Sequence, residues 1–304
     1  MTPTSIGNTR LSAPTIRQRL QSDSRARVAL GVLAAIALAA VAAPLLAPYD
    51  PRAQLDIAYL QSQSPSLAHP LGTDTFSRDV LSRLIYGTRV SLTIALVAVS
   101  ISAAFGTLLG AVAGYVGGAI DAVVMRFVDA ALSIPTVLLL IVVIVLWGEV
   151  SIVSLTFLLA GVSWFTISRL VRAETLAVRD ADYVVAARAL GVPGWRILAA
   201  HVLPNAIGPA VVSATLAVGN IILLEAGLSY LGIGVRPPTP SWGNIIEEGA
   251  TRVSDIWWLT LFPGLAILVT VFAFNALGDA LRDALDPRQL LSSHDDAPFA
   301  QTHA

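Results

Sequence analysis

The sequence predicts an all-α integral membrane protein with six transmembrane helices. Two observations carry this prediction, the composition and a series of six long apolar segments. Of 304 residues, 55% are hydrophobic and only 13% are charged, and the mean hydropathy is +0.73. A soluble domain carries about 25% charged residues, and this chain has too few to cover so much apolar surface.

Each predicted span is a largely apolar run, and a helix needs roughly 20 such residues to cross the hydrocarbon core of a bilayer. The six spans cover residues 28–47, 90–116, 130–146, 151–168, 206–224 and 257–277. The first span could be read as a secretory signal peptide. However, its apolar run exceeds the roughly 7–15 residues of a signal peptide, and a long polar segment precedes it. We therefore expect an uncleaved span.

The distribution of arginine predicts that both termini are cytoplasmic. The sequence contains no Lys, so all 19 basic residues are Arg. With the N-terminus inside, most of them fall on the cytoplasmic side, as the positive-inside rule requires. This orientation divides the chain into a series of segments. They are a cytoplasmic tail 1–27, a first span 28–47, an external loop 48–89, a five-helix core 90–280 that includes a cytoplasmic loop 169–205, and a cytoplasmic tail 281–304.

The composition also excludes several kinds of chemistry. Without Lys the chain has no standard P-loop, and without Cys it has no disulfide, thiolate nucleophile or Cys-ligated metal site. The four His residues show no metal-ligand spacing, and no Ser/His/Asp set stands out. We expect no catalytic residue, no metal and no cofactor bound by this chain. The net charge of −1 gives no case for nucleic-acid binding.

The interiors of the predicted spans contain no ionisable side chain. Proton-coupled and ion-coupled transporters usually carry such groups inside the membrane. A stand-alone secondary transporter is therefore disfavoured, and the energy source is expected outside this chain.

Glycine recurs every fourth residue at Gly106, Gly110, Gly114 and Gly118 in the second span. Such a stripe lets helix backbones approach closely. We expect it to pack helices within one bundle, and a subunit interface is the alternative. Pro135 in the third span and Pro263 in the sixth can each kink a helix.

The external loop 48–89 has the pattern of an amphipathic helix that begins at Thr73 or Asp74 and ends at Gly87. Its apolar positions are Phe76, Val80, Leu81, Leu84 and Ile85, and its charged positions are Arg78, Asp79 and Arg83. This pattern predicts a helix lying at the membrane interface.

The second external loop, 225–256, contains a stiff Pro-rich stretch at 237–240 that is followed by Trp242. Trp242 either contacts an external partner or packs on the bundle. The candidates for an external gate are Glu225, Ser229, Tyr230 and Trp242.

The cytoplasmic loop 169–205 has the pattern of a docking knob for another protein. The fourth span continues to about Arg179, and a short helix follows from Asp182, its expected N-cap, to Leu190. Gly191 has the position of a helix C′ residue. A second helical stretch, 195–202, is expected to end near Pro204.

These residues resemble a known motif. Ala186-Ala187, Gly191 and Leu203-Pro204 have the spacing of the EAA loop of ABC-importer permeases, although Val185 stands at the Glu position and His201 at the Ile position. Other segments are similar to the dipeptide/oligopeptide (peptide/nickel) branch of these binding-protein-dependent permeases. They are 69–74, 77–83, 228–232, 237–243, 277–279 and 282–288. The resemblance covers nearly the whole chain, roughly residues 25–288.

The resemblance implies a type I ABC-importer permease fold with a cytoplasmic coupling helix. It implies a bacterial inner-membrane location, a second homologous permease subunit, two cytoplasmic ATPase subunits that bind ATP and Mg²⁺, and an external solute-binding protein. The ATPase-coupling residues would be Tyr183, Val185, Ala186, Ala187, Ala189, Leu190, Gly191, His201, Leu203 and Pro204. The implied substrates are short peptides or related small solutes, among them nickel complexes. The alternative is a membrane anchor or assembly subunit without its own translocation path.

Overall fold

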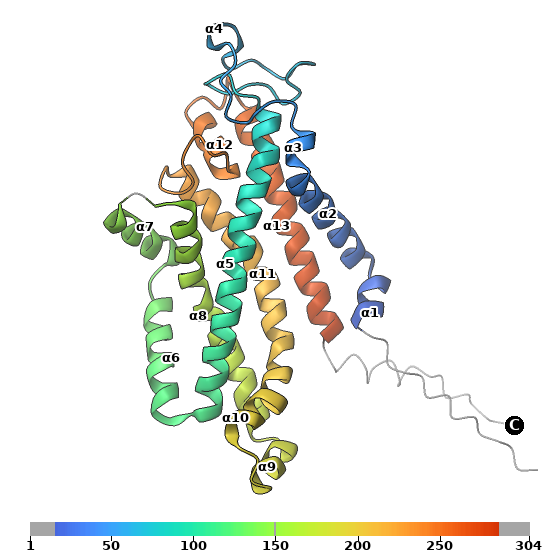
Figure 1. Cartoon of the computed structure of the whole chain (residues 1–304), viewed down its shortest axis with the longest axis vertical. Coiled ribbons are helices and arrows are strands. Elements are labelled where there is room, and N and C mark those ends of the chain that lie inside the picture. Colours follow the sequence, from blue (N-terminus) through green and yellow to red (C-terminus); the bar gives the residue numbers. More distant parts are fainter. Residues whose placement is uncertain (1–15, 149, 286–304) are drawn as a thin grey trace, which may run out of the picture.

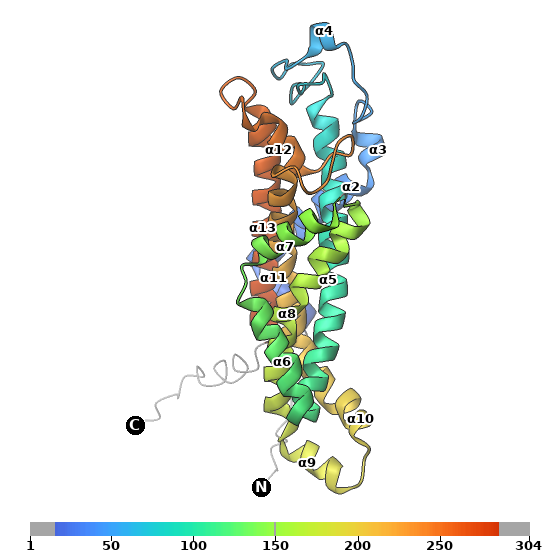
Figure 2. The ribbon, with the colours of Figure 1, turned by 90° about the vertical axis from the view of Figure 1, so that its left-hand side faces the viewer.

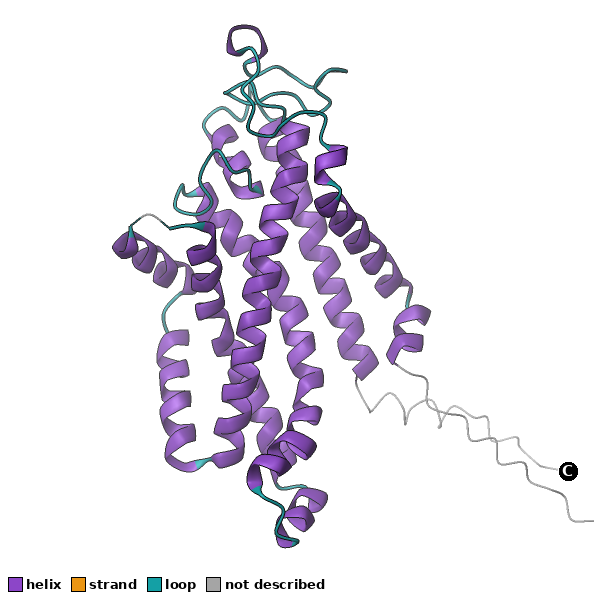
Figure 3. Cartoon of the chain, in the orientation of Figure 1, coloured by secondary structure: helices purple, strands orange, loops and turns teal. Residues whose placement is uncertain are grey.

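The structure, a computed structural model, describes residues 16–148 and 150–285, where all regular secondary structure is helical (Figures 1 and 3). The predicted tails 1–27 and 281–304 lie partly outside the described residues. The α-helices are α1 (Ile16–Ser22), α2 (Ser24–Val41), α3 (Ala43–Leu46), α4 (Ile57–Leu60), α5 (Val80–Val116), α6 (Gly118–Leu132), α7 (Thr136–Trp147), α8 (Ile152–Arg179), α9 (Asp182–Ala189), α10 (Gly194–Ile197), α11 (Leu203–Tyr230), α12 (Trp242–Ala250) and α13 (Trp258–Leu285). A π-helical turn, Leu198–Val202, joins α10 to α11.

The long helices form a bundle whose apolar core lies between α5, α8, α11 and α13. Side chains such as Ile94, Leu159, Ile221 and Ile222 are almost completely buried there. The most extensive helix contact is between α5 and α8, and α2 packs along α13 at one edge of the bundle (Figure 1). Helix α4 and helix α9 lie at opposite ends of the long axis (Figures 1 and 2). We refer to these as the α4 end and the α9 end.

Five helical segments are long and apolar enough to cross a membrane: α2, α5, α8, the continuous stretch Gly194–Tyr230, and α13. They coincide with five of the six predicted spans. Each of them runs several residues past at least one predicted boundary; α2, for example, begins at Ser24, four residues before the predicted start. The predicted first span is shorter than expected: Pro44 lacks a backbone N–H, α2 ends at Val41, and residues 43–46 form the separate helix α3.

The predicted third span, 130–146, is wrong as a single helix. Helix α6 ends at Leu132 and α7 begins at Thr136, and the two axes meet at 89°. The cause is Pro135, which lacks a backbone N–H and disfavours helical geometry in the residue before it. The described residues give six spans only if this bent pair counts as one, so the sixth span stays a prediction.

The predicted amphipathic helix at the membrane interface is also wrong. Neither Thr73 nor Asp74 begins a helix; Asp79 caps α5, its carboxylate accepting from the Ser82 backbone N–H at 2.8 Å. Helix α5 then runs past Gly87 without a break to Val116. Arg83 on α5 pairs with Glu248 of α12 and is completely buried. This part of α5 therefore does not present its charged residues to water or to lipid headgroups.

Two further elements shape the α4 end. The Pro-rich stretch leads into α12, which starts with a capping box in which the Ser241 side chain and the Asn244 side chain bond to each other's backbone N–H groups. At Gly87, an added Cβ would lie 3.4 Å from the Ser241 carbonyl carbon and from the Trp242 ring. Gly87 therefore gives α12 the room to begin against α5.

At the α9 end, α8 continues to Arg179 as predicted, and α9 forms where expected. Its N-cap is Ala181, with no side-chain hydrogen bond, and Asp182 is its first residue. The expectation that the second helical stretch ends near Pro204 is wrong. The chain stays helical through the π-helical turn Leu198–Val202 into α11, and Pro204 is the second residue of α11.

Candidate functional site

Helices α9 and α10 form a folded protrusion at the α9 end (Figure 1). Its base is held by Val184, Ile197 and Val202, whose side chains are completely buried and pack with Tyr115 at the end of α5. Since the base is packed, the protrusion is attached firmly to the bundle and differs from a flexible linker.

Four large apolar side chains are exposed on the protrusion, beside the exposed charges of Asp182, Arg188 and Arg196. Tyr183 is 50% exposed, Val185 49%, Leu190 84% and Trp195 68%. We call these four residues the apolar docking face. Ala186 and Ala189 are also exposed. At the position where the resemblance leads one to expect a carboxylate, the structure therefore presents Val185 to its surroundings.

Gly191 reverses the chain between α9 and α10. Its φ of +78° lies in the left-handed region, which favours glycine, and its N–H donates to the Arg188 carbonyl oxygen at 3.0 Å. An added Cβ would meet nothing within 4 Å, so the surroundings are open. Gly191 thus stands at the tip, as a C′ residue, with space around it for a partner.

The remaining coupling candidates lie beneath this tip. The His201 ring lies beside Tyr183, with centroids 6.3 Å apart, and the His201 carbonyl oxygen accepts from the Asn205 side chain at 2.6 Å. Leu203 packs against the bundle core and Pro204 is exposed in the first turn of α11. His201 therefore lies next to Tyr183 of the docking face, whereas Leu203 and Pro204 are the first two residues of α11.

Three of the four candidate glycines lie where α5 packs against α8. An added Cβ at Gly106 would be 2.8 Å from the Trp164 carbonyl oxygen, and one at Gly114 would be 2.9 Å from the Thr175 side chain. At Gly110 it would overlap the Ser168 carbonyl group. Each of these glycines is a point of backbone contact within the chain, where no larger side chain fits.

Gly118 is not part of this stripe. It begins α6 with φ of +58°, and an added Cβ would meet nothing within 4 Å. The regular spacing of the four glycines suggested one helix, but α5 ends at Val116. At the same end, the Arg172 guanidinium donates to both carboxylate oxygens of Asp121 at 2.5 and 2.6 Å, which ties α8 to α6.

Glu225 lies in a buried joint between α5, α11 and α12. Its side chain is completely buried, and its two carboxylate oxygens accept from the Ser91 hydroxyl at 2.9 Å and the Ser229 hydroxyl at 2.7 Å. Trp242 is 1% exposed, and its backbone N–H points to the Ser91 hydroxyl at 3.4 Å. Of the two readings of Trp242, exposure to a partner is therefore wrong.

Tyr230, the fourth gate candidate, is 46% exposed and lies outside this joint. The boundary predicted for the fifth span placed Glu225 just past the end of the helix. Because α11 continues to Tyr230, this ionisable residue belongs to the bundle. A role of these residues as an external gate stays a prediction.

A buried cluster of four charged side chains, which the sequence did not predict, lies at the α4 end. The charge cluster consists of Asp74, Arg78, Arg83 and Glu248, whose side chains are at most 6% exposed. Arg78 donates to Asp74 at 2.7 Å and to Glu248 at 2.8 Å, and Arg83 donates to Glu248 at 2.6 and 2.7 Å and also to Asp74. Two carboxylates and two guanidiniums balance each other, as buried charges require.

A second set of polar contacts continues from the charge cluster. His69 Nδ1 lies 3.0 Å from an Asp79 carboxylate oxygen, and the other Asp79 oxygen accepts from the Ser82 hydroxyl at 2.7 Å. The Trp258 indole N–H donates to the Thr73 carbonyl oxygen at 3.0 Å. Together these bonds join the loop before α5 to α5, α12 and α13. The charged residues between 69 and 83 were the only sign of this cluster in the sequence. Glu248, which pairs with Arg78 and Arg83, lies far away along the chain.

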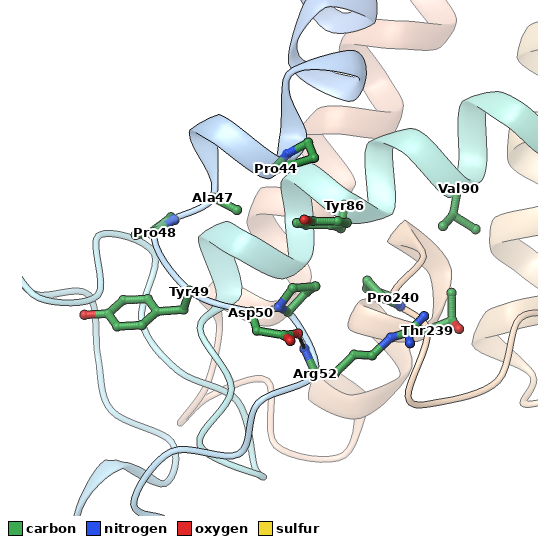
Figure 4. Close-up of a pocket in the computed structure, with 11 residues that line it drawn as sticks. Pro44, Ala47, Pro48, Tyr49, Asp50, Arg52, Tyr86, Val90, Thr239 and Pro240 are labelled. Atoms are coloured by element: carbon green, nitrogen blue, oxygen red, sulfur yellow. Dashed lines mark hydrogen bonds between the residues drawn. The ribbon is translucent and has the colours of Figure 1, made fainter.

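A cavity of about 520 Å³ opens beside α3 and the start of α5 at the same end (Figure 4). Its lining includes Asp50 and Arg52 together with Tyr86 and Pro240, so apolar and charged groups share it. Within residues 16–148 and 150–285, no group of three or more His, Asp or Glu side chains is placed to hold a metal ion.

Comparison with known proteins gives two family matches. Residues 106–290 match the family described as the binding-protein-dependent transport system inner membrane component, and residues 15–65 match the N-terminal transmembrane domain of oligopeptide transport permease C. The chain is 41% identical to a dipeptide transport system permease protein of Haemophilus influenzae, over 83% of this chain and 87% of the relative. It is 37% identical to the corresponding protein of Alkalihalophilus pseudofirmus, over 89% of this chain and 88% of the relative.

Proposed function

The chain belongs to the family of binding-protein-dependent transport system inner membrane components, and from this premise we propose that it carries short peptides across the bacterial inner membrane. It is a multi-pass permease subunit of an ABC transporter, with a transport role and not a catalytic one. The proposed substrate follows from the relatives, which are dipeptide permeases. Their names also speak against a membrane anchor without a translocation path.

The proposed energy source is a pair of cytoplasmic ATPase subunits that dock on the α9 protrusion. The single observation that carries this proposal is the apolar docking face, which is exposed on a firmly packed protrusion between the predicted fourth and fifth spans. Exposed apolar surface of this kind marks a protein contact. ATP and Mg²⁺ would be bound by those subunits, since this chain has no Lys for a P-loop.

The remaining partners complete the proposed assembly. A second, homologous permease would pair with this chain in the membrane, and a solute-binding protein would deliver the peptide to the α4 end. With α9 in the cytoplasm, both termini are cytoplasmic and the α4 end faces outward, which agrees with the distribution of Arg.

Two continuous helical paths can carry movement from the protrusion to the opposite end. Helix α8 is joined to α9 by a short turn after Arg179. On the other side of the protrusion, α10 is the first part of the unbroken helical stretch from Gly194 to Tyr230. The second path ends at the Glu225 joint, where α5 and α12 meet α11. A shift of α9 caused by closure of the ATPases would therefore tilt both helices together and reach the outward end.

Gly191→Trp tests this proposal. A large side chain in the open space at the tip should block docking, so peptide uptake into proteoliposomes should fall at least tenfold, while the subunit still inserts into the membrane. Gly148→Trp is the matched control, because Gly148 is also left-handed, with φ of +87°, has nothing within 4 Å, and lies outside the protrusion. Normal uptake by the Gly191→Trp transporter would disprove the docking role of α9.

A further inference from the structure

The loop between α4 and α5 has no exposed charge. Between residues 57 and 80, the acidic, basic and histidine side chains are His69, Asp74, Arg78 and Asp79, and all four are buried. Each is hydrogen-bonded within the loop, to α5 or to Glu248. Loops in water normally expose charged side chains. This loop uses its charges internally and presents a neutral surface.

The neutral surface contains an apolar patch. Ile57 is 46% exposed, Tyr59 77% and Phe76 47%, and we call these three residues the outer patch. Hydrogen bonds on both sides of Phe76 place it beside α4. The Ser77 hydroxyl donates to the Asp56 carbonyl oxygen at 3.2 Å, and the Gln61 side chain donates to the Thr75 carbonyl oxygen at 2.9 Å.

The outer patch is held rigidly. The Thr73 hydroxyl donates to the Leu60 carbonyl oxygen at the end of α4 and accepts from the Gln63 backbone N–H at 2.9 Å. The next residue, Asp74, accepts from the Ser62 backbone N–H through its carbonyl oxygen at 3.0 Å, and its carboxylate belongs to the charge cluster. A surface fixed in this way loses little conformational entropy when a partner binds.

We propose that the outer patch is the docking surface for the external solute-binding protein, which would contact it with a neutral, apolar face. This inference rests on the proposed function and names the part of the chain that receives that partner. The family is binding-protein-dependent, and α4 lies at the tip of the molecule opposite α9 (Figures 1 and 2). Anionic lipid headgroups do not fit, because no basic side chain is exposed between residues 57 and 80.

The test is stimulation of ATP hydrolysis in the complete reconstituted transporter. The probe is the purified solute-binding protein that stimulates the unmutated transporter most strongly, loaded with a tripeptide. In Tyr59→Asp and Ile57→Asp, an unpaired charge enters an apolar contact, so the binding-protein concentration for half-maximal stimulation should rise at least tenfold. Phe76 is left unchanged, because the Arg78 guanidinium lies 4.9 Å from its ring centroid and would pair with a carboxylate there. Basal hydrolysis should not change, and Tyr59→Phe should behave like the unmutated chain.

Val253→Asp is the matched control. Val253 is 47% exposed, close to the 46% of Ile57, and belongs to the turn between α12 and α13. Stimulation of this variant should be normal. An equal loss in Val253→Asp, or unchanged stimulation in both outer-patch variants, would overturn the assignment of the docking surface. Loss of the second permease from purified Tyr59→Asp complexes would also overturn it, because the outer patch would then be a subunit interface.

Failure of this inference is distinguishable from failure of the proposed function. The proposed function is judged on ATP-driven peptide uptake by the unmutated transporter and on Gly191→Trp. The docking surface is judged on the difference between outer-patch variants and Val253→Asp.

Discussion

At the scale of single residues, the neutralisation of buried charge is the main feature of the α4 end. Arg78 and Arg83 each contact both Asp74 and Glu248, and the two carboxylates come from segments far apart in the sequence. A buried ion pair contributes little net stability compared with apolar side chains, but removal of one member leaves the other charge buried and unpaired. The cluster therefore strongly penalises any arrangement that separates α12 from α5.

Replacement of Glu248 measures this penalty. Glu248→Ala leaves two buried guanidiniums with one carboxylate, and we expect the free energy of unfolding to fall by about 3–5 kcal/mol. The neighbouring Glu247 is exposed, so Glu247→Ala should change the free energy of unfolding by less than about 0.5 kcal/mol. Denaturant unfolding in detergent micelles measures both. Similar stability of the two variants would show that the cluster does not hold α12 to α5.

The charge cluster also shows a limit of prediction from sequence. The pattern of apolar and charged residues between 76 and 85 predicts a helix that begins at Thr73 or Asp74, but the structure is helical only from Val80 onward. The pattern also assigns Arg78 and Arg83 to a face in contact with water. Periodicity identifies which residues share a face, but what covers the face depends on the position of Glu248, which is distant in the chain.

At the scale of secondary-structure elements, the close contact of α5 with α8 organises the bundle. Gly106, Gly110 and Gly114 bring the two backbones together, and α8 leads directly to the α9 protrusion. In a membrane, where apolar side chains gain little by leaving lipid, such close packing is a principal source of helix association. The two helices therefore act as one rigid pair beneath the protrusion.

A methyl group at Gly110 tests this contact. Gly110→Ala would force the α5 and α8 backbones apart at Ser168, and we expect a loss of about 1–3 kcal/mol in the free energy of unfolding. Gly161→Ala is the control, because Gly161 is also in a spanning helix but has nothing within 4 Å of an added Cβ. The control should be neutral or slightly stabilising, since alanine favours a helix over glycine. Equal thermal stabilities of the two variants would contradict tight packing at Gly110.

Local sequence signals predicted the elements well where the cause was local. The left-handed Gly191, the end of α9 and the continuation of α8 to Arg179 all follow from capping and periodicity within a few residues. The break at Pro135 shows where such signals fall short. Proline indicates a possible kink, but an 89° bend depends on how α6 and α7 pack against their neighbours.

At the scale of the whole molecule, the predicted topology has the α9 end in the cytoplasm and the α4 end outside. The chain has no natural Cys, so a single introduced thiol reports its side of the membrane without background. Ser64 and Ala189 are exposed and lie toward opposite ends of the structure, in the loop after α4 and in α9.

A membrane-impermeant maleimide provides the measurement. In right-side-out vesicles it should label Ser64→Cys and leave Ala189→Cys unlabelled, and in inverted vesicles the pattern should reverse. Labelling of both positions from the same side would disprove the topology, and with it the assignment of cytoplasmic and external partners to the two ends. The Arg distribution would then require another explanation.

The sequence by itself determined the membrane class, the apolar helices and the family, because these depend on composition, on runs of roughly 20 residues and on motifs in order. It also determined the tip of the protrusion, where Gly191 acts through its own backbone. Only the tertiary structure decided where the charges go. Glu225 is buried among serines of α5 and α11, and Arg83 is paired with Glu248 on α12. The physical reason is that an ionisable side chain is stable in an apolar bundle only beside a hydrogen-bonding group or an opposite charge, and here that partner is often far away in the sequence.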